Sequence, residues 1–306
     1  MLHSLTHCSN LRAYLMLTVT ALCWAANVVF GKLAVGEIPP MLLVTVRWLG
    51  VVLLLFVLLG RDIAAQAAVL KRHFWFLTAL ASSGLTLFNA LYYVAAHSTS
   101  GANLGILQGS IPVLVIIGGW LVFRSAGGVT QLIGVAITLA GVLLVSIGGS
   151  WAALRALAFN QGDLLMLLAC VLFAGYTLAL SRKPALPGLV FFAMLACLAL
   201  MTSLPLVAWE YVSGQGFAPT ATGWVLVVLV TLFPSFIAQI CFIQGVALIG
   251  PSRAGVFINL VPVFATFMVV GVLDEPFEHF QLVALLLVLG GIVIAESGKP
   301  GQGNVR

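Results

Sequence analysis

Long apolar stretches, separated by short polar or Gly- and Pro-containing segments, cover most of this chain. Within each stretch the apolar residues run continuously instead of alternating with polar ones, which favours membrane-spanning helices over a β-barrel. Breaks at charges, prolines and glycines predict ten spans: 12–33, 41–59, 74–96, 99–123, 128–147, 162–181, 188–211, 222–247, 251–273 and 277–295. Each is about long enough for a ~30 Å hydrocarbon layer. We therefore expect an all-α polytopic membrane protein.

The chain also repeats itself, because segment 91–148 returns as 241–298 at a constant offset of 150 residues. Matched positions include Gly105 and Gly255, Pro112 and Pro262, Gln131 and Gln281, and Gly141 and Gly291. Two similar halves around one central site are typical of transporters. We predict two domains, 1–150 and 151–306, each a five-helix repeat. Since five is odd, the second repeat is expected to be inverted in the membrane.

Composition and charge support a membrane location and predict an orientation. The chain is 62% hydrophobic and 7% charged, whereas soluble domains are about a quarter charged. With a cytoplasmic N-terminus, ten of the thirteen basic residues fall inside: Arg12, Arg61, Lys71, Arg72, Arg124, Arg182, Lys183, Arg253, Lys299 and Arg306. Both termini should then be cytoplasmic, at the inner membrane. The net charge of +5 needs no nucleic-acid partner.

The apolar run after Arg12 is interpreted as a retained helix and not as a signal peptide, because it continues to about Leu33. The remaining sequence shows no signature of an enzyme. It has no GxxxxGK[ST], HExxH or GxSxG motif, so we expect neither ATP-driven transport nor catalysis. The cysteines are scattered and predict neither a metal site nor a cofactor: Cys8, Cys23, Cys170, Cys197 and Cys241.

Several segments resemble one known family. The first-helix sequence ALCWAANVVFGK and the matched pair GILQGSIPV and GVFINLVPV resemble the EamA branch of the drug/metabolite transporter superfamily. Overall likeness is greatest to YddG-type exporters of aromatic amino acids. The resemblance implies a cavity lined by the first, third, fourth, sixth, eighth and ninth helices, with the fifth and tenth packed together at the periphery.

A polar stripe on the third span gives that cavity candidate residues. Ser82, Thr86, Asn89, Tyr93 and His97 recur at helical spacing, and Gln239 on the eighth span occupies the repeat position of Asn89. Lipid offers such groups no hydrogen-bond partner. They therefore either line a cavity or form hydrogen bonds to a neighbouring helix. Both interpretations remain open.

Aromatic residues and prolines add further candidates. Trp24 and Asn27 lie one turn apart on the first helix, and Tyr176 is the counterpart of Asn27 on the sixth. Rings beside polar tips suit an amphipathic solute, although such rings also simply pack. Pro112 and Pro262 each follow a glycine, Gly105 and Gly255, by seven residues. Paired helix interruptions indicate either the binding site or hinge of a transporter, or passive kinks. Asn259 lies close to the second proline and is the polar candidate at that interruption.

Two charged or titratable residues need an explanation. Arg47 lies roughly 10 Å inside the second span, where it could pair with Glu210 or Glu37, extend to the headgroups or meet a substrate carboxylate. His97, at the end of the third span, is expected to contact substrate or to gate. Imidazoles titrate near neutral pH, so a role as proton carrier is the alternative.

The sequence thus predicts a transporter of small organic solutes, most plausibly an exporter of amino acids with aromatic or apolar side chains, by facilitated alternating access. A proton-coupled multidrug or cationic-metabolite exporter is the runner-up, and a membrane sensor or channel subunit represents a different class. A monomer is plausible. Expected partners are the small-molecule substrate and the lipid bilayer.

The predicted topology can be tested by cysteine labelling of intact cells. Cysteines at Ser125 and Ser181 should be shielded from an impermeant thiol reagent added outside, whereas those at Gln215 and Glu278 should react. Labelling of all four positions would contradict the inverted repeat.

Overall fold

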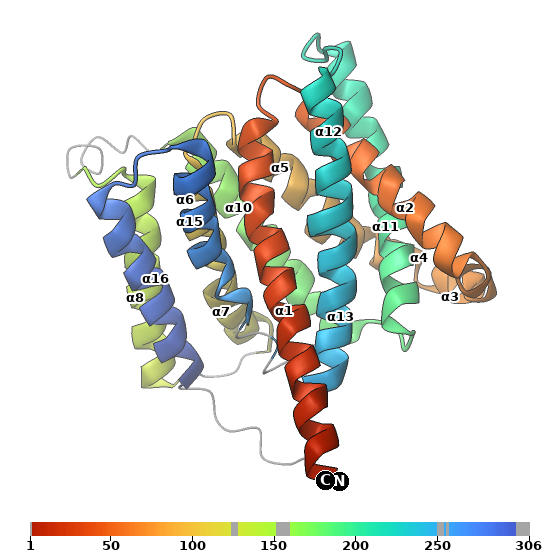
Figure 1. Cartoon of the computed structure of the whole chain (residues 1–306), viewed down its shortest axis with the longest axis horizontal. Coiled ribbons are helices and arrows are strands. Elements are labelled where there is room, and N and C mark those ends of the chain that lie inside the picture. Colours follow the sequence, from red (N-terminus) through yellow and green to blue (C-terminus); the bar gives the residue numbers. More distant parts are fainter. Residues whose placement is uncertain (1, 124–127, 151–159, 250–253, 255–256, 298–306) are drawn as a thin grey trace.

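In the computed structural model of the chain, the apolar segments form a bundle of helices (Figure 1). The structure describes residues 2–123, 128–150, 160–249, 254 and 257–297, and these ranges contain no strand. The first half comprises α1 (Leu2–Leu33), α2 (Pro40–Ala65), α3 (Ala67–Arg72), α4 (Phe74–Ala81), the π-helical η1 (Ser82–Leu87), α5 (Phe88–Ala95), α6 (Gly101–Gln108), α7 (Ile111–Phe123) and α8 (Val129–Ser146). The second half comprises α10 (Gln161–Ala179), the short 3₁₀ turn η2 (Leu180–Arg182), α11 (Gly188–Val212), α12 (Ala221–Val230), the π-helical η3 (Thr231–Ile237), α13 (Ala238–Ile249), α15 (Val261–Leu273) and α16 (His279–Ser297).

The helices confirm the predicted fold class. Eight helical segments in the described ranges are long and apolar enough to cross a membrane, and the last two segments are shorter apolar helices. Together they follow the ten predicted spans. Some predictions fall outside the described residues: those on Arg124, Ser125, Arg253, Gly255, Lys299, Arg306 and the side chain of Cys8. The domain boundary between residues 150 and 151 borders such a gap and stays a prediction.

Corresponding helices of the two halves run in opposite directions. Lys32, at the C-terminal end of α1, donates from Nζ to the carbonyl of Thr99 at 2.8 Å. The hydroxyl of Thr99 in turn donates to Asp163, in the first turn of α10. The end of α1 and the start of α10 therefore lie at the same end of the bundle. Because each is the first helix of its half, the second half is inverted.

The halves interlock through equivalent contacts. α1 packs against α13 and α15, whereas its counterpart α10 packs against α5 and α7. The first helix of each half thus inserts between the third and fourth spans of the other half. α2 packs against α11, and α8 pairs with α16 at one edge of the bundle (Figure 1). The expectation that the fifth and tenth helices pack together at the periphery is confirmed.

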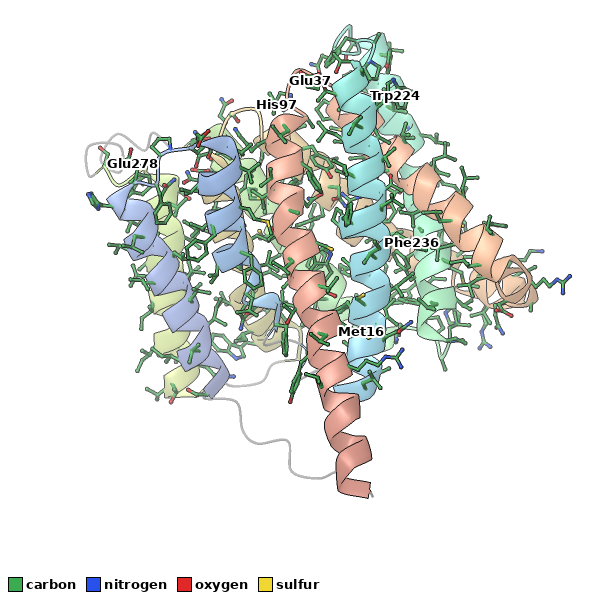
Figure 2. All side chains as sticks on the ribbon, viewed as in Figure 1. Met16, Glu37, His97, Trp224, Phe236 and Glu278 are labelled. Atoms are coloured by element: carbon green, nitrogen blue, oxygen red, sulfur yellow. The ribbon has the colours of Figure 1, made fainter. Side chains whose placement is uncertain are left out.

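The two ends of the bundle differ in their residues. Figure 2 shows Glu37, His97, Trp224 and Glu278 toward one end, which we call the His97 end, and Met16 toward the other. α2 starts near Glu37, so its exposed Arg61 lies at the opposite end. The basic residues of α3 follow directly after it. This separation agrees with the predicted sorting of charge, while the orientation of the termini stays a prediction.

Small residues bring α8 and α16 into close contact. A Cβ added to Gly291 would lie 2.7 Å from the carbonyl oxygen of Gly134, and one added to Gly134 would lie 2.3 Å from the backbone nitrogen of Ala295. Helix backbones approach this closely in membranes only where side chains are absent, because packing there depends on van der Waals contact.

This seam makes Gly291 and its neighbour Gly290 a matched pair for a stability test. Gly291→Ala should destabilise the purified protein by about 1–3 kcal/mol, because the new methyl group meets backbone that cannot move aside. Gly290→Ala should be neutral or slightly stabilising, since nothing lies within 4 Å of its added Cβ. Thermal unfolding in detergent measures both, and equal melting temperatures would contradict the close seam.

Candidate functional site

Five polar side chains from four helical segments form one hydrogen-bonded group, which we call the Arg47 cluster: Asn27, Arg47, Asn89, Tyr93 and Ser235. Arg47 Nη1 donates to Asn89 Oδ1 at 2.6 Å and to the Tyr93 hydroxyl at 2.8 Å, and its Nε donates to the Ser235 hydroxyl. The Tyr93 hydroxyl donates onward to Asn27 Oδ1 at 2.9 Å. The cluster therefore joins α1, α2 and α5 of the first half to η3 of the second.

The Arg47 cluster lies inside the protein and not against lipid. Arg47 is only 5% exposed and Ser235 is fully buried. Of the two acidic partners considered from the sequence, Glu210 accepts hydrogen bonds from the backbone of Met41 and Leu42 at the start of α2, and Glu37 accepts one from Thr220. Both of those pairings are therefore wrong, and so is an extension of Arg47 toward the headgroups.

A π-helical turn explains how η3 presents Ser235. Pro234 has no N–H, so the carbonyl of Val230 loses its regular helical partner. In the π-turn the pairing shifts by one residue, and the Ser235 hydroxyl also donates to the Val230 carbonyl at 2.6 Å while it accepts from Arg47. π-Turns within helices are frequent at functional sites.

The first half carries a π-turn at the equivalent position, η1, where Gly84 stands at the repeat position of Pro234. Because a π-turn contains extra residues, it changes the face on which later side chains lie. The predicted polar stripe is accordingly divided. Thr86 hydrogen-bonds the Ala199 carbonyl and Thr202 on α11, as interhelical contacts do, whereas Asn89 and Tyr93 reach Arg47.

A series of aromatic rings leads away from the Arg47 cluster toward α10. Tyr93 and Tyr92 have ring centroids 5.4 Å apart, Tyr92 and Phe88 6.1 Å, and Phe88 and Phe173 5.0 Å. Phe173 and Tyr176 follow at 5.3 Å. Tyr176 lies directly on the backbone of η1, since a Cβ on Gly84 would be 2.3 Å from its ring. The series gives the buried polar group an apolar, aromatic extension.

Both fourth spans of the repeats are interrupted where the sequence predicts. α6 ends before Gly109 and α7 begins at Ile111, while α15 begins at Val261 after a turn at Asn259 and Leu260. Each proline, Pro112 or Pro262, is the second residue of the new helix, a position that requires no N–H donor. The Oδ1 atom of Asn259 is buried and has no hydrogen-bond partner among the described residues. Gly105 permits α6 to approach Ala265 of α15.

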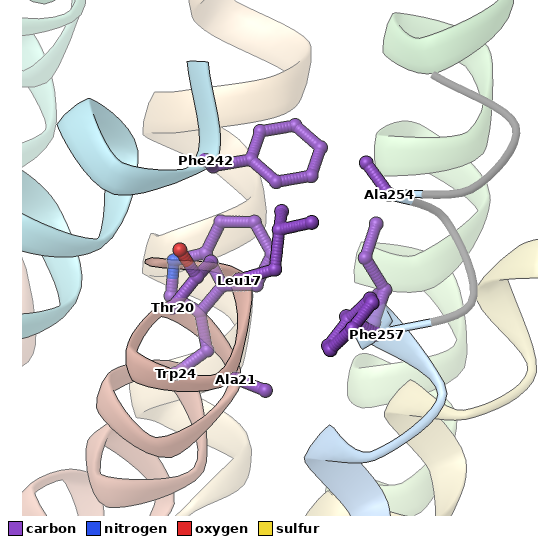
Figure 3. Close-up of a pocket in the computed structure, with 8 residues that line it drawn as sticks. Leu17, Thr20, Ala21, Trp24, Phe242, Ala254 and Phe257 are labelled. Atoms are coloured by element: carbon purple, nitrogen blue, oxygen red, sulfur yellow. The ribbon is translucent and has the colours of Figure 1, made fainter. Parts of the chain in front are cut away.

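Next to the second break, an apolar recess lies between the halves (Figure 3). Residues of α1 face α13 and the segment before α15 across it: Leu17, Thr20, Ala21, Trp24, Phe242, Ala254, Phe257 and Ile258. The Trp24 indole donates to the Pro234 carbonyl at 3.2 Å. The recess leaves no room for a water molecule, so the halves are closed against each other here.

Polar contacts also close the halves at the His97 end. Asp163 accepts from the Thr99 hydroxyl and from Asn103 Nδ2 at 3.3 Å, and Gln281 Nε2 donates to Asn103 Oδ1 at 2.9 Å. Glu275 accepts from the backbone of Gly101 and lies 4.0 Å from Lys32 Nζ. These bonds tie α1 and α6 to α10 and α16.

A hollow of about 390 Å³ opens at the same end, outside the closed region. Its lining includes His97, Trp209, Glu210 and Phe217. His97 is exposed, and its Nδ1 lies 3.0 Å from the Tyr93 carbonyl. The imidazole therefore lies outside the Arg47 cluster, one helical turn toward the His97 end.

Comparisons with known proteins agree with this architecture. The sequence model of the EamA-like transporter family matches residues 11–147 and again 160–296. The chain belongs to the EamA-like transporter family. It is therefore a membrane transporter, and each match covers one of the two halves described above.

Relatives of this EamA-like transporter match over nearly their whole length. The uncharacterized transporter YetK of Bacillus subtilis (strain 168) is 26% identical over 92% of this chain and 86% of its own. The uncharacterized inner membrane transporter YedA of Escherichia coli (strain K12) is 24% identical over 90% and 88%. A crystal structure with a TM-score of 0.62 and 20% identity covers 94% of this chain and 99% of that one, and it shows the shared fold alone. A particular closeness to YddG-type exporters stays a prediction.

The structure brings only some of the predicted site residues of this EamA-like transporter together. Asn27, Asn89 and Tyr93 meet in the Arg47 cluster, and Tyr176 ends the aromatic series. The other candidates lie elsewhere: Trp24 at the recess, Asn259 at the helix break, His97 at the hollow, and the half-buried Gln239 with no hydrogen bond to a described residue.

Sequence reasoning missed two structural contributors to this site. Pro234 within an apolar span was an available signal for η3. Asp163 lies at the start of the predicted span 162–181 and was not singled out, but the structure shows it only 1% exposed. No pattern in the sequence indicated that its neighbours would be Thr99 and Asn103.

The two helix breaks yield a transport prediction for this family member. Pro112→Ala and Pro262→Ala should each reduce flux severalfold while the protein stays folded, because alanine supplies the N–H that lets the helix continue across the break. Pro205→Ala is the control, since Pro205 is an exposed proline inside α11 and belongs to neither break. Radiotracer flux in liposomes measures all three variants. Wild-type flux in both Pro112→Ala and Pro262→Ala would show that the two helix breaks have no role in transport.

Proposed function

We propose that this transporter moves small organic solutes, namely amino acids with aromatic or other apolar side chains and related metabolites, and that it exports them from the cell. The observation that carries the proposal is the aromatic series that ends on the Arg47 cluster. A buried polar group continued by five rings suits a solute with one polar end and one apolar end.

The proposed mechanism is alternating access by rocking of the two inverted halves in the cytoplasmic membrane, with both termini in the cytoplasm. The interlocked first helices and the paired breaks support it, because inverted halves can exchange their conformations around a fixed central site. The halves touch both at the recess and at the His97 end, so each of these contacts has to open in turn.

Transport is proposed to be facilitative. The Arg47 cluster contains no carboxylate or imidazole, and His97 lies outside it. No group in the cluster other than the guanidinium is therefore charged, and a guanidinium does not release its proton in proteins.

One observation favours the proton-coupled, cation-exporting alternative. Asp163 is a carboxylate buried among neutral partners, as an intramembrane proton relay would be. Against this, it lies in the first turn of α10, where its charge is stabilised by the helix N-terminus. The same flux assay separates the two: uphill uptake of a cationic dye driven by a pH gradient, abolished in Asp163→Asn, would support the alternative.

Flux through the purified full-length protein in liposomes tests the proposal directly. Radiolabelled phenylalanine, tryptophan and leucine should equilibrate across the membrane without a pH gradient, whereas aspartate should not, because its second carboxylate would enter an apolar space. Empty liposomes are the control. If none of the three apolar amino acids moves faster than in empty liposomes, the proposed substrate class is wrong.

A further inference from the structure

Arg47 is a buried cation that the protein itself does not neutralise. Among the described residues its guanidinium forms no salt bridge, and the acidic groups near the helix ends have other tasks. Glu210 binds the start of α2, Glu275 binds Gly101 and lies near Lys32, and Asp163 binds Thr99. A charge at 5% exposure inside a membrane protein is costly unless an opposite charge approaches it.

The hydrogen bonds of Arg47 orient the guanidinium without cancelling its charge. Its Nε and Nη1 bind Ser235, Asn89 and Tyr93, all of them neutral. Nη2 has no hydrogen bond to any described residue.

The three neutral acceptors are themselves fixed. Asn89 Nδ2 donates to the Leu85 carbonyl at 2.6 Å, the Ser235 hydroxyl donates to Val230, and the Tyr93 hydroxyl donates to Asn27. The Arg47 guanidinium is therefore held in place, while its Nη2 has no acceptor among the described residues.

Three residues next to the Arg47 cluster carry further buried polar atoms without partners. Trp48 Nε1, Tyr92 OH and Thr231 Oγ1 have no hydrogen bond to a described residue, and Trp48 and Tyr92 are only 1% exposed. The Trp48 ring centroid is 5.3 Å from Arg47 Cζ, the Tyr92 ring neighbours Tyr93, and Thr231 packs on Gly50, one turn after Arg47. All three can donate, and buried donors normally have an acceptor.

We propose that Arg47 binds the carboxylate of the transported solute, so that the substrate class is small organic carboxylates, amino acids included, and not amines or cationic compounds. This inference rests on the proposed function of the same site. Nη2 is the free donor that first meets the carboxylate, and a guanidinium matches a carboxylate in geometry as well as in charge. The aromatic series then accommodates the apolar side chain.

Ligand binding to the purified full-length protein in detergent tests this without passive leak of the probes. The probes share one ring and differ in their ends: phenylalanine, phenylalaninamide, 3-phenylpropionate and phenethylamine. An aliphatic pair, leucine and leucinamide, runs beside them. Calorimetry and thermal stabilisation should show binding of the three carboxylates and binding at least about tenfold weaker, or none, for the two amides and the amine.

Variants identify the group responsible. Arg47→Gln should weaken phenylalanine binding by at least about tenfold. Arg47→Lys keeps the positive charge but lacks the two-pronged guanidinium, so its affinity for phenylalanine should lie between those of the wild type and Arg47→Gln. Arg61→Gln removes an exposed arginine from the same helix and should leave binding unchanged. If Arg47→Gln does not fold, the comparison of acids with amides on the wild-type protein still decides.

The outcomes separate this inference from the proposed function. Equal binding of phenylalanine and phenylalaninamide, or unchanged binding in Arg47→Gln, would overturn the carboxylate role while leaving an aromatic transporter. Arg47-dependent binding of leucine alone would support the carboxylate role and contradict the role that the proposed function gives to the aromatic series. Binding of the amides or the amine in preference to the acids would refute both and favour the cationic-metabolite alternative.

Discussion

Inside a bilayer no water is available to satisfy a polar group, so each one has to find its partner within the protein. That constraint organises this transporter. Ser235 donates to the carbonyl that Pro234 leaves without its regular donor, Glu210 accepts from the first amides of α2, and the Arg47 cluster joins five polar side chains at the junction of the halves. Where the requirement is not met, at Asn259, Tyr92 and Trp48, the structure indicates where solvent or a ligand would be expected.

The two halves share their architecture but not their chemistry. Helix breaks, π-turns and interlocked first helices occur in both, and these are the features that an exchange of conformations needs. The polar side chains are distributed unequally, because the repeat positions of Tyr93 and His97 are Ile243 and Ala247. Only Ser235 represents the second half in the Arg47 cluster. In the proposed mechanism the shared architecture supplies the motion, while the Arg47 cluster takes four of its five side chains from the first half.

Much of the fold could be predicted from the sequence, because its signals are local. Continuous apolar runs gave the spans, a repeat with an odd number of helices gave the inversion, and the matched Gly-x₆-Pro segments gave the breaks at Gly109 and Asn259. Arg47 was noticed as a costly charge, but its partners lie 42, 46 and 188 residues away along the chain. Those contacts depend on how α2, α5 and η3 are rotated against one another, and the π-turns that set this rotation have only a proline or a glycine as their sequence signal.

In the proposed mechanism, the position of Ser235 links substrate binding to closure of the halves. Its bond to Arg47 is the cluster's hydrogen bond to the second half, and Trp24 adds a second bond from α1 to the same η3 turn through the Pro234 carbonyl. The Pro234 carbonyl is open to Trp24 because the π-turn directs the Ala238 amide to the Phe233 carbonyl, whereas Ser235 reaches Arg47 through its side chain. A rocking motion that separates α1 and α2 from η3 has to break them together, and an acceptor that replaces Ser235 at the guanidinium lowers the cost of doing so. The π-turn in the eighth span therefore matters less as a kink than as the segment that presents the Pro234 carbonyl and the Ser235 hydroxyl to the first half.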